Sequence, residues 1–305
     1  DATPTFVGTA EAGAAVRLLV DGVTAAVGVA DTLTGTWTLT AAATLAAGSY
    51  SIQAQAEDAA GNVATSGSLG IVIGPDPETS GEVIDGYVAG ATVFIDTDGD
   101  GALDIGESRA VSDAAGGFTI TGSGPLVAFG GTDIATGKAF DGMMSAPTGY
   151  SVITPVTTLI EKLVSSGAAV DVAAAESQVR SQFSIDGSVD LAAFDPIAET
   201  LAGNAAAGAV LQASAAIQST LALSAAVVAG ASGGSEATAY AAAASALAAA
   251  LAADPALDLT SSTAVAGVVA QTAVELGIVD ATVLAAVASA STGTAEVIAG
   301  LNQTA

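Results

Sequence analysis

The residues whose types and spacing most clearly define a chemistry lie at 96–107, which read DTDGDGALDIGE. Carboxylates stand at positions one, three, five, nine and twelve of this stretch: Asp96, Asp98, Asp100, Asp104 and Glu107. Gly101 falls at position six, where a loop of this kind turns sharply. This is the acidic spacing of a twelve-residue calcium loop.

A calcium ion takes six to eight oxygen ligands at about 2.3–2.6 Å. Here the three alternating aspartates, a backbone carbonyl, a water held by the fourth aspartate and a bidentate glutamate can supply them. The alternative is a solvated acidic turn between two strands. We predict a calcium ion bound by Asp96, Asp98, Asp100, Ala102, Asp104 and Glu107.

The flanks of this loop indicate strands. An EF-hand has a helix on each side, but residues 91–95, 109–112 and 116–120 are short β-branched and aromatic runs broken by glycine. A calcium ion held between strands stiffens a β-domain. It opens no helical groove, so a signalling role is not expected.

Composition excludes several functional classes. The chain has 31 acidic and five basic residues, a net charge of −26, and neither cysteine nor histidine. Such a charge argues against nucleic acid and anionic membrane surfaces as partners, because both demand a basic protein surface. Without cysteine there is no disulfide framework, thiolate catalysis or soft-metal site. Without histidine the commonest general base is missing.

The sequence shows no targeting segment. The chain opens DATPTF, without methionine, a basic segment or an apolar segment, so we expect a processed product or a piece of a longer protein. Residues 200–235 carry no charge, but they contain Gln212 and Gln218 and have no flanking Lys or Arg. Alanine is close to neutral for membrane insertion. We therefore predict no membrane span.

Residues 1–74 show the pattern of a β-sandwich. Apolar residues alternate with others along several short stretches, as at Val16, Leu18 and Val20, and glycines mark turns between the stretches. Trp37 is expected to plug the core.

The runs TFVGTAEAGAAVRLLVDG and ADTLTGTWTLTAAATLAAGSYSIQAQAEDAAGN resemble a bacterial immunoglobulin-like repeat, of the kind strung together in giant adhesins and biofilm matrix proteins. The resemblance implies a stalk or spacer. In some such families calcium sits at the junctions between repeats. Glu11 and Asp58 could serve there, and the alternative is that both are solvated turn residues.

Residues 75–81, with two prolines and two glycines in the stretch from Gly74, are predicted to be a linker. A second β-domain is expected at 82–150. Its strings VIDGYVAGATVFIDTDGDGALDIGE and SDAAGGFTI resemble the small prealbumin-like sandwich domains of bacterial surface proteins, which implies a rigid spacer. Related domains can form lysine isopeptide cross-links, but Lys138 has no convincing partner in the sequence, so no cross-link is expected.

From about residue 152 the apolar period changes from two to 3.6. Thr154 and Pro155 form a helix start, and Gly167 ends that helix. Further helices are expected at about 171–183, just before Phe194, and at about 197–229, 235–253, 261–276 and 280–300. Their alanine content predicts close packing, either in a bundle or against partner chains. SVITPVTTLIEKLV through FDPIAETLAG also resembles a segment that follows such β-domains in large proteobacterial surface proteins.

Enzymatic activity is not expected. Paired carboxylates and a Ser–Lys pair are the only chemistries that the residue inventory leaves open, and Asp133, Lys138 and Asp141 lie in one loop without a spacing that sets a mechanism. Alanine-rich helices with threonine also raise an ice-binding hypothesis. That surface needs regularly spaced threonines on one face, which residues 197–300 lack.

The predicted fold is multidomain β + α: two small β-sandwich domains, at 1–74 and 82–150, followed by an alanine-rich helical bundle at 151–305. The predicted function is an extracellular, cell-surface structural protein. In this hypothesis calcium stiffens the chain, and copies of it assemble into a surface layer, filament or biofilm matrix. The alternatives are a monomeric stalk and an adhesin fragment that binds a protein or cell-surface carbohydrate.

Overall fold

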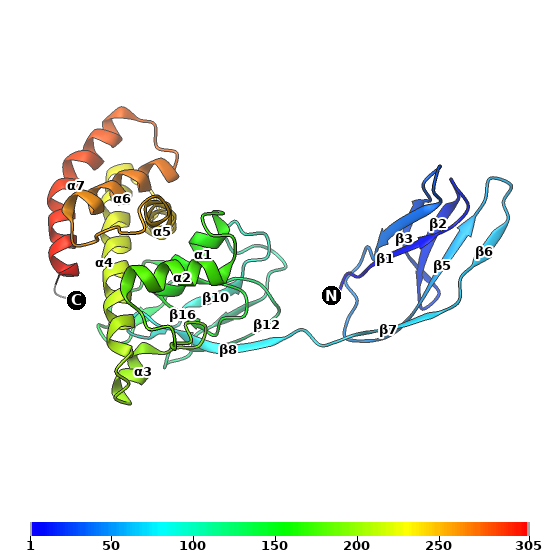
Figure 1. Ribbon diagram of the computed structural model, residues 1–305, viewed down its shortest axis with the longest axis horizontal. Coiled ribbons are helices and arrows are strands. Elements are labelled where there is room, and N and C mark those ends of the chain that lie inside the picture. The colour runs from blue at the N-terminus through cyan, green and yellow to red at the C-terminus, as the bar shows by residue number, and fades with distance from the viewer. Residues whose placement is uncertain (1, 304–305) are drawn as a thin grey trace. The chain divides into compact units, whose positions relative to one another are not determined.

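The computed structural model describes residues 2–303. Within them sixteen strands precede seven helices (Figure 1), which confirms the predicted class of β-domains followed by a helical region. Contacts divide the chain into two compact units, Asp1–Pro77 and Glu78–Ala305, hereafter the first and the second unit.

The first unit is a β-sandwich of two unequal sheets. Its strands are β1 (Thr5–Thr9), β2 (Ala15–Val20), β3 (Val23–Val29), β4 (Thr36–Thr40), β5 (Gly48–Glu57), β6 (Val63–Thr65) and β7 (Leu69–Ile73). One sheet is β1 paired with β4, and the other has the order β3-β2-β5-β6, with β7 also paired to β5. The period-two pattern turns Leu18, Val20 and Ile52 inward, where they form the core.

Trp37, which we expected to plug the core, is half-buried and lies over a glycine. The β1–β4 register places it opposite Gly8. A Cβ atom at Gly8 would lie 2.3 Å from Cζ2 of the indole, so only glycine leaves room for the ring.

Replacing Gly8 with alanine should therefore destabilise the first unit by about 1–3 kcal/mol, the usual cost of overpacking. The fluorescence of Trp37, the only tryptophan, can follow unfolding in urea. Gly70→Ala is the matched control, because nothing lies within 4 Å of a Cβ there. Equal midpoints for the two variants would contradict this packing.

The second unit begins with three small sheets. Its strands are β8 (Glu78–Val83), β9 (Val88–Ala89), β10 (Thr92–Ile95), β11 (Arg109–Val111), β12 (Gly117–Thr121), β13 (Leu126–Phe129), β14 (Thr132–Asp133), β15 (Met143–Ala146) and β16 (Val152–Ile153). The sheet orders are β11-β10-β13-β15, β12-β8-β16 and β14-β9. Strand β16 runs parallel to β8, and the other pairs are antiparallel.

The linker expected at 75–81 is shorter than predicted, because β8 already begins at Glu78. Pro75 and Pro77 lack the N–H groups that a strand ladder needs, so they keep residues 75–77 out of the sheet. The residues of β8 contain no proline and can pair. Gly81, which was predicted to lie in the linker, belongs to β8. A Cβ there would lie 1.6 Å from the Ser151 carbonyl oxygen, so the close approach of the chain just before β16 requires glycine.

The helices are α1 (Pro155–Ser165), α2 (Val172–Phe183), α3 (Pro196–Leu201), α4 (Ala207–Ser232), α5 (Glu236–Ala253), α6 (Ser262–Glu275) and α7 (Ala281–Asn302). Thr154 caps α1 and Pro155 is its first residue, as predicted. Two predictions are wrong. The helix expected at 197–229 is broken into α3 and α4, where Gly203 has a φ of 80°. The residues just before Phe194 form turns and no helix.

One continuous core joins the sheets of the second unit to its helices. It runs from Val93 and Met144 in the sheets, through Ile160 of α1, to Leu247 of α5. Helix α5 packs on α1, α4 and α6, and α4 also packs on α7 (Figure 1). Alanines on several faces of α5 are buried, because small side chains let neighbouring helices approach. The boundary predicted at 150/151 stays a prediction, and the two parts share this core.

The prediction that the chain has no membrane span is wrong. Helices α4, α5 and α7 are long and apolar enough to cross a membrane, with mean hydropathies of 1.5, 1.3 and 1.4 over 18 residues. This finding concerns length and composition only. The prediction failed because it rested on residues 200–235 alone and discounted alanine. Alanine still raises mean hydropathy, and all three helices are almost free of charge.

Candidate metal centre

The acidic loop closes a hairpin between two neighbouring strands. Strand β10 ends at Ile95 and β11 begins at Arg109, and the Ile95 N–H donates to the Ser108 carbonyl at 3.0 Å. The Asp96 N–H donates to the Pro125 carbonyl, also at 3.0 Å, just before β13 begins. Since β10 lies between β11 and β13, the first loop residue is held beside both neighbours of its strand.

Asp96 organises the first half of the loop. It is 7% exposed, and its two carboxylate oxygens accept hydrogen bonds from the N–H groups of Gly99, at 2.8 Å, and Gly101, at 3.0 Å. Both glycines have left-handed backbone conformations, with φ of 81° and 77°. The chain thus wraps around the Asp96 carboxylate, which explains the need for glycine at loop position six.

Glu107 closes the loop from the other end. Its Oε1 accepts from the Thr97 N–H at 2.7 Å and the Thr97 hydroxyl at 3.1 Å, and its Oε2 accepts from the Asp104 N–H at 3.0 Å. These bonds, that from Asp104 first, lower the pKa of Glu107. The side chain is therefore held anionic across the loop, and its oxygens keep further lone pairs for a cation.

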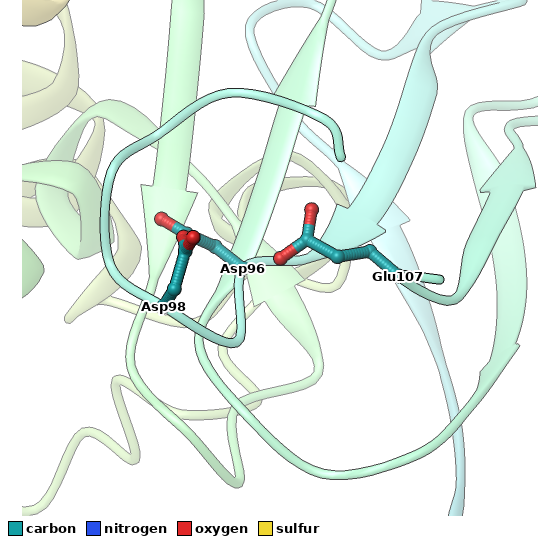
Figure 2. A group of neighbouring side chains, drawn as sticks. All are labelled: Asp96, Asp98 and Glu107. Carbon is teal, nitrogen blue, oxygen red and sulfur yellow. The ribbon is translucent and has the colours of Figure 1, made fainter. Parts of the chain in front are cut away.

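The predicted carboxylates gather in two overlapping groups. Oxygens of Asp96, Asp98 and Glu107 lie within 4.8 Å of one another, and Figure 2 shows these side chains beside one another. Oxygens of Asp98, Asp100 and Asp104 form the second group under the same limit. Asp98 belongs to both, so each of the five side chains predicted as ligands lies in one of two adjoining groups.

The negative charge of Asp100 raises the pKa of Asp104 most, followed by partial desolvation and then by the charges of the other loop carboxylates. A bound divalent cation would reverse that repulsion. Ala102 is exposed, and its N–H donates to Oδ1 of Asp100 at 2.7 Å. The role of its carbonyl as a ligand stays a prediction.

A second cluster of titratable residues was only partly foreseen. Asp133, Lys138 and Asp141 line a cavity of about 310 Å³ together with Asp85, which no sequence motif marked. Within residues 2–303 Lys138 forms no ion pair. Among the described residues that line this cavity, no nucleophile lies at hydrogen-bonding distance from a base. The absence of enzymatic activity stays a prediction.

Asp85, in the turn after β8, belongs to a hydrogen-bonded chain that reaches two helices. Its carboxylate accepts from the Gln218 side chain of α4 at 2.6 Å, and the Gln218 carbonyl accepts from the hydroxyl of Tyr240 in α5. Burial, and then the charge of Asp133, raise the pKa of Asp85 to about 6. No local motif could have found Asp85, because its partner is 133 residues away in the sequence.

Glu11 and Asp58 lie outside both carboxylate groups found in residues 2–303. Asp58 closes a turn, since it accepts from the N–H groups of Ala60 and Asn62 and from the Asn62 side chain. These bonds, those from Asn62 first, lower its pKa.

Comparison with known proteins is informative for the first unit. Residues 1–74 match the family described as bacterial Ig-like domain. This bears out the immunoglobulin-like resemblance, and the prealbumin-like resemblance of the second β-domain stays a prediction. No curated protein matches the chain.

One similar solved structure is described as "Ca2+-stabilized adhesin helps an Antarctic bacterium reach out and bind ice". It is 18% identical, and the match covers 48% of this chain and 43% of that chain, with a TM-score of 0.18. The matched part is thus less than half of that chain's length.

Proposed function

We propose that this chain is a structural segment of a bacterial surface protein, stiffened by calcium in the loop at 96–107. The observation that carries the proposal is the pair of overlapping carboxylate groups, pinned by backbone N–H groups between two strands. The match of residues 1–74 to bacterial Ig-like domains supports the setting.

The position of the loop determines what calcium would do. The ion would bridge Asp96, at the end of β10, and Glu107, just before β11. Asp96 is also tied to Pro125 beside β13, so binding would restrain three strands of one sheet. The effect is a more rigid β-region, and oxygen-rich loops of this type favour calcium over softer ions.

We further propose that calcium permits assembly into a layer, filament or matrix. At a net charge of −26 copies of the chain repel one another, and salt screens this repulsion over about 8 Å at physiological strength. Calcium neutralises carboxylates directly. The adhesin alternative is favoured by a groove between the two sheets of the first unit.

Sedimentation velocity and electron microscopy across a calcium titration test the assembly step. Wild-type chain should form ordered assemblies with calcium and dispersed particles with a chelator at low salt. Glu107→Gln should need more calcium, whereas Asp76→Asn, an equal loss of charge at an exposed residue before β8, should behave as wild type. A single monomeric species at every calcium and protein concentration would overturn assembly and leave a calcium-stiffened spacer.

A further inference from the structure

The two sheets of the first unit enclose a groove with a volume of about 630 Å³. Val16, Leu18 and Ile52 of the larger sheet lie on one side, and Phe6 of β1 and Trp37 of β4 lie on the other. The groove exists because the β1–β4 pair covers only part of a five-stranded sheet. Its volume lies in the range of sites that hold ligands, about 300–1,000 Å³.

One wall of the groove is an unpaired strand edge. Among the described residues β1 pairs with β4 alone. The Pro4 carbonyl accepts from the Ala41 N–H at 3.1 Å, and the Ala10 N–H donates to the Gly35 carbonyl at 2.8 Å, in the register that continues through β1 and β4. The backbone groups of the even-numbered residues of β1 therefore bond to β4.

In an antiparallel ladder the residues between the bonded pairs direct their N–H and C=O groups to the opposite edge. In β1 these are Thr5, Val7 and Thr9. An added strand could bond to all three, in the mode by which extended peptides join sheet edges. Such an unprotected edge beside apolar side chains is a template for pairing with another chain.

Charge indicates the kind of strand that fits. The described residues that line the groove include Glu11 and Asp58 but no lysine or arginine. Glu11 follows the end of β1. Asp58 follows β5, whose last residue, Glu57, pairs with Ala15 near the Glu11 turn, so both carboxylates lie at one end of the groove. A second copy is a poor occupant, because this chain has only five basic residues.

We propose that the first unit binds an extended strand of another protein along β1. The strand runs antiparallel to β1, places alternate apolar side chains in the groove, and carries a basic residue at its N-terminal end, facing Glu11 and Asp58. The proposal rests on the groove, the free edge and the charge, and it is independent of the calcium loop.

A synthetic peptide tests this directly. The probe is a capped, fluorescein-labelled peptide of about seven residues, with lysine first and then alternating threonine and valine, so that lysine and the valines share one face. Fluorescence anisotropy with the full chain should show saturable binding. Val7→Pro removes an edge N–H without removing a β4 bond, and should weaken binding at least about tenfold, whereas Val7→Thr keeps the N–H and should bind as wild type.

A charge reversal provides the second test. Glu11→Lys should weaken binding of the lysine peptide several-fold and strengthen binding of a peptide with glutamate in its place. It also keeps the proposal testable if Val7→Pro fails to fold, which Trp37 fluorescence would reveal. No saturable binding by wild type, or equal binding of the lysine peptide by wild type, Val7→Pro and Glu11→Lys, would overturn the proposal. A wild-type dimer that Val7→Thr keeps and Val7→Pro abolishes would overturn it too, and would assign the edge to a second copy.

Discussion

Calcium should raise the melting temperature of the second unit by roughly 5–10 °C when its free concentration is about a hundred times the dissociation constant. A ligand that binds only the folded state adds about 2.7 kcal/mol under that condition. For a unit of this size one kcal/mol corresponds to about 2–4 °C. The physical source is the relief of repulsion among the carboxylates around Asp98. Calorimetry with calcium and with a chelator measures the difference.

Glu107→Gln should abolish most of that shift, because it removes one charge and the bidentate ligand from the loop. Asp76→Asn removes one charge from an exposed position outside the loop and should keep the full shift. In the presence of chelator, Glu107→Gln should be at most about 1 kcal/mol less stable than wild type, since the glutamine oxygen still accepts one of the backbone hydrogen bonds. Identical melts of wild type in calcium and chelator would contradict the metal site.

Asp85→Asn should stabilise the chain by roughly 2–3 kcal/mol at pH 7 and have little effect near pH 4. The pKa of Asp85 is about 6 in the folded chain, against an ordinary value of 3.8. Below about pH 4 both states bind the proton and no penalty exists. Between about pH 4 and 6 the unfolded chain releases its proton first, so the unfolding free energy falls as pH rises, and above about 6 the loss is complete.

Urea unfolding at several pH values measures this effect as the difference between variant and wild type, because other carboxylates also titrate in that range. The asparagine that replaces Asp85 would keep an oxygen to accept from Gln218. Asp141→Asn is the matched control, because it makes the same change at an exposed carboxyl that lines the same cavity. A constant difference between Asp85→Asn and wild type from about pH 4 to 7 would contradict the burial of a charged Asp85.

The parts of this protein that follow from local physics were predictable from its sequence. The loop positions of Asp96, Gly101 and Glu107 lie within twelve residues, so their spacing alone specifies which oxygens can meet and where the backbone must turn. Thr154 and Pro155 likewise begin α1 through bonds to their own neighbours. The alternation in β2 indicates which side chains are buried, whatever strand lies beside it.

The local sequence pattern was insufficient to predict two features of the alanine-rich helices. The helix expected at 197–229 breaks at Gly203, where the backbone is left-handed. The sequence pattern did not reveal this break, because the alanines on both sides favour helix and one glycine does not outweigh them. The membrane prediction failed for a related reason. The apolar character of α5 and α7 is spread over many alanines, so it is evident only when hydropathy is averaged over the whole helix.

Only the tertiary structure decided which distant residues meet. The Asp85–Gln218–Tyr240 chain joins a β-region to two helices, and the pKa of Asp85 depends on that burial, which no local spacing encodes. The shared core of sheets and helices, and the free edge of β1 beside the groove, are likewise properties of packing and pairing. Sequence spacing determines contacts within a turn or loop, whereas contacts across a fold depend on how whole elements bury their apolar faces together.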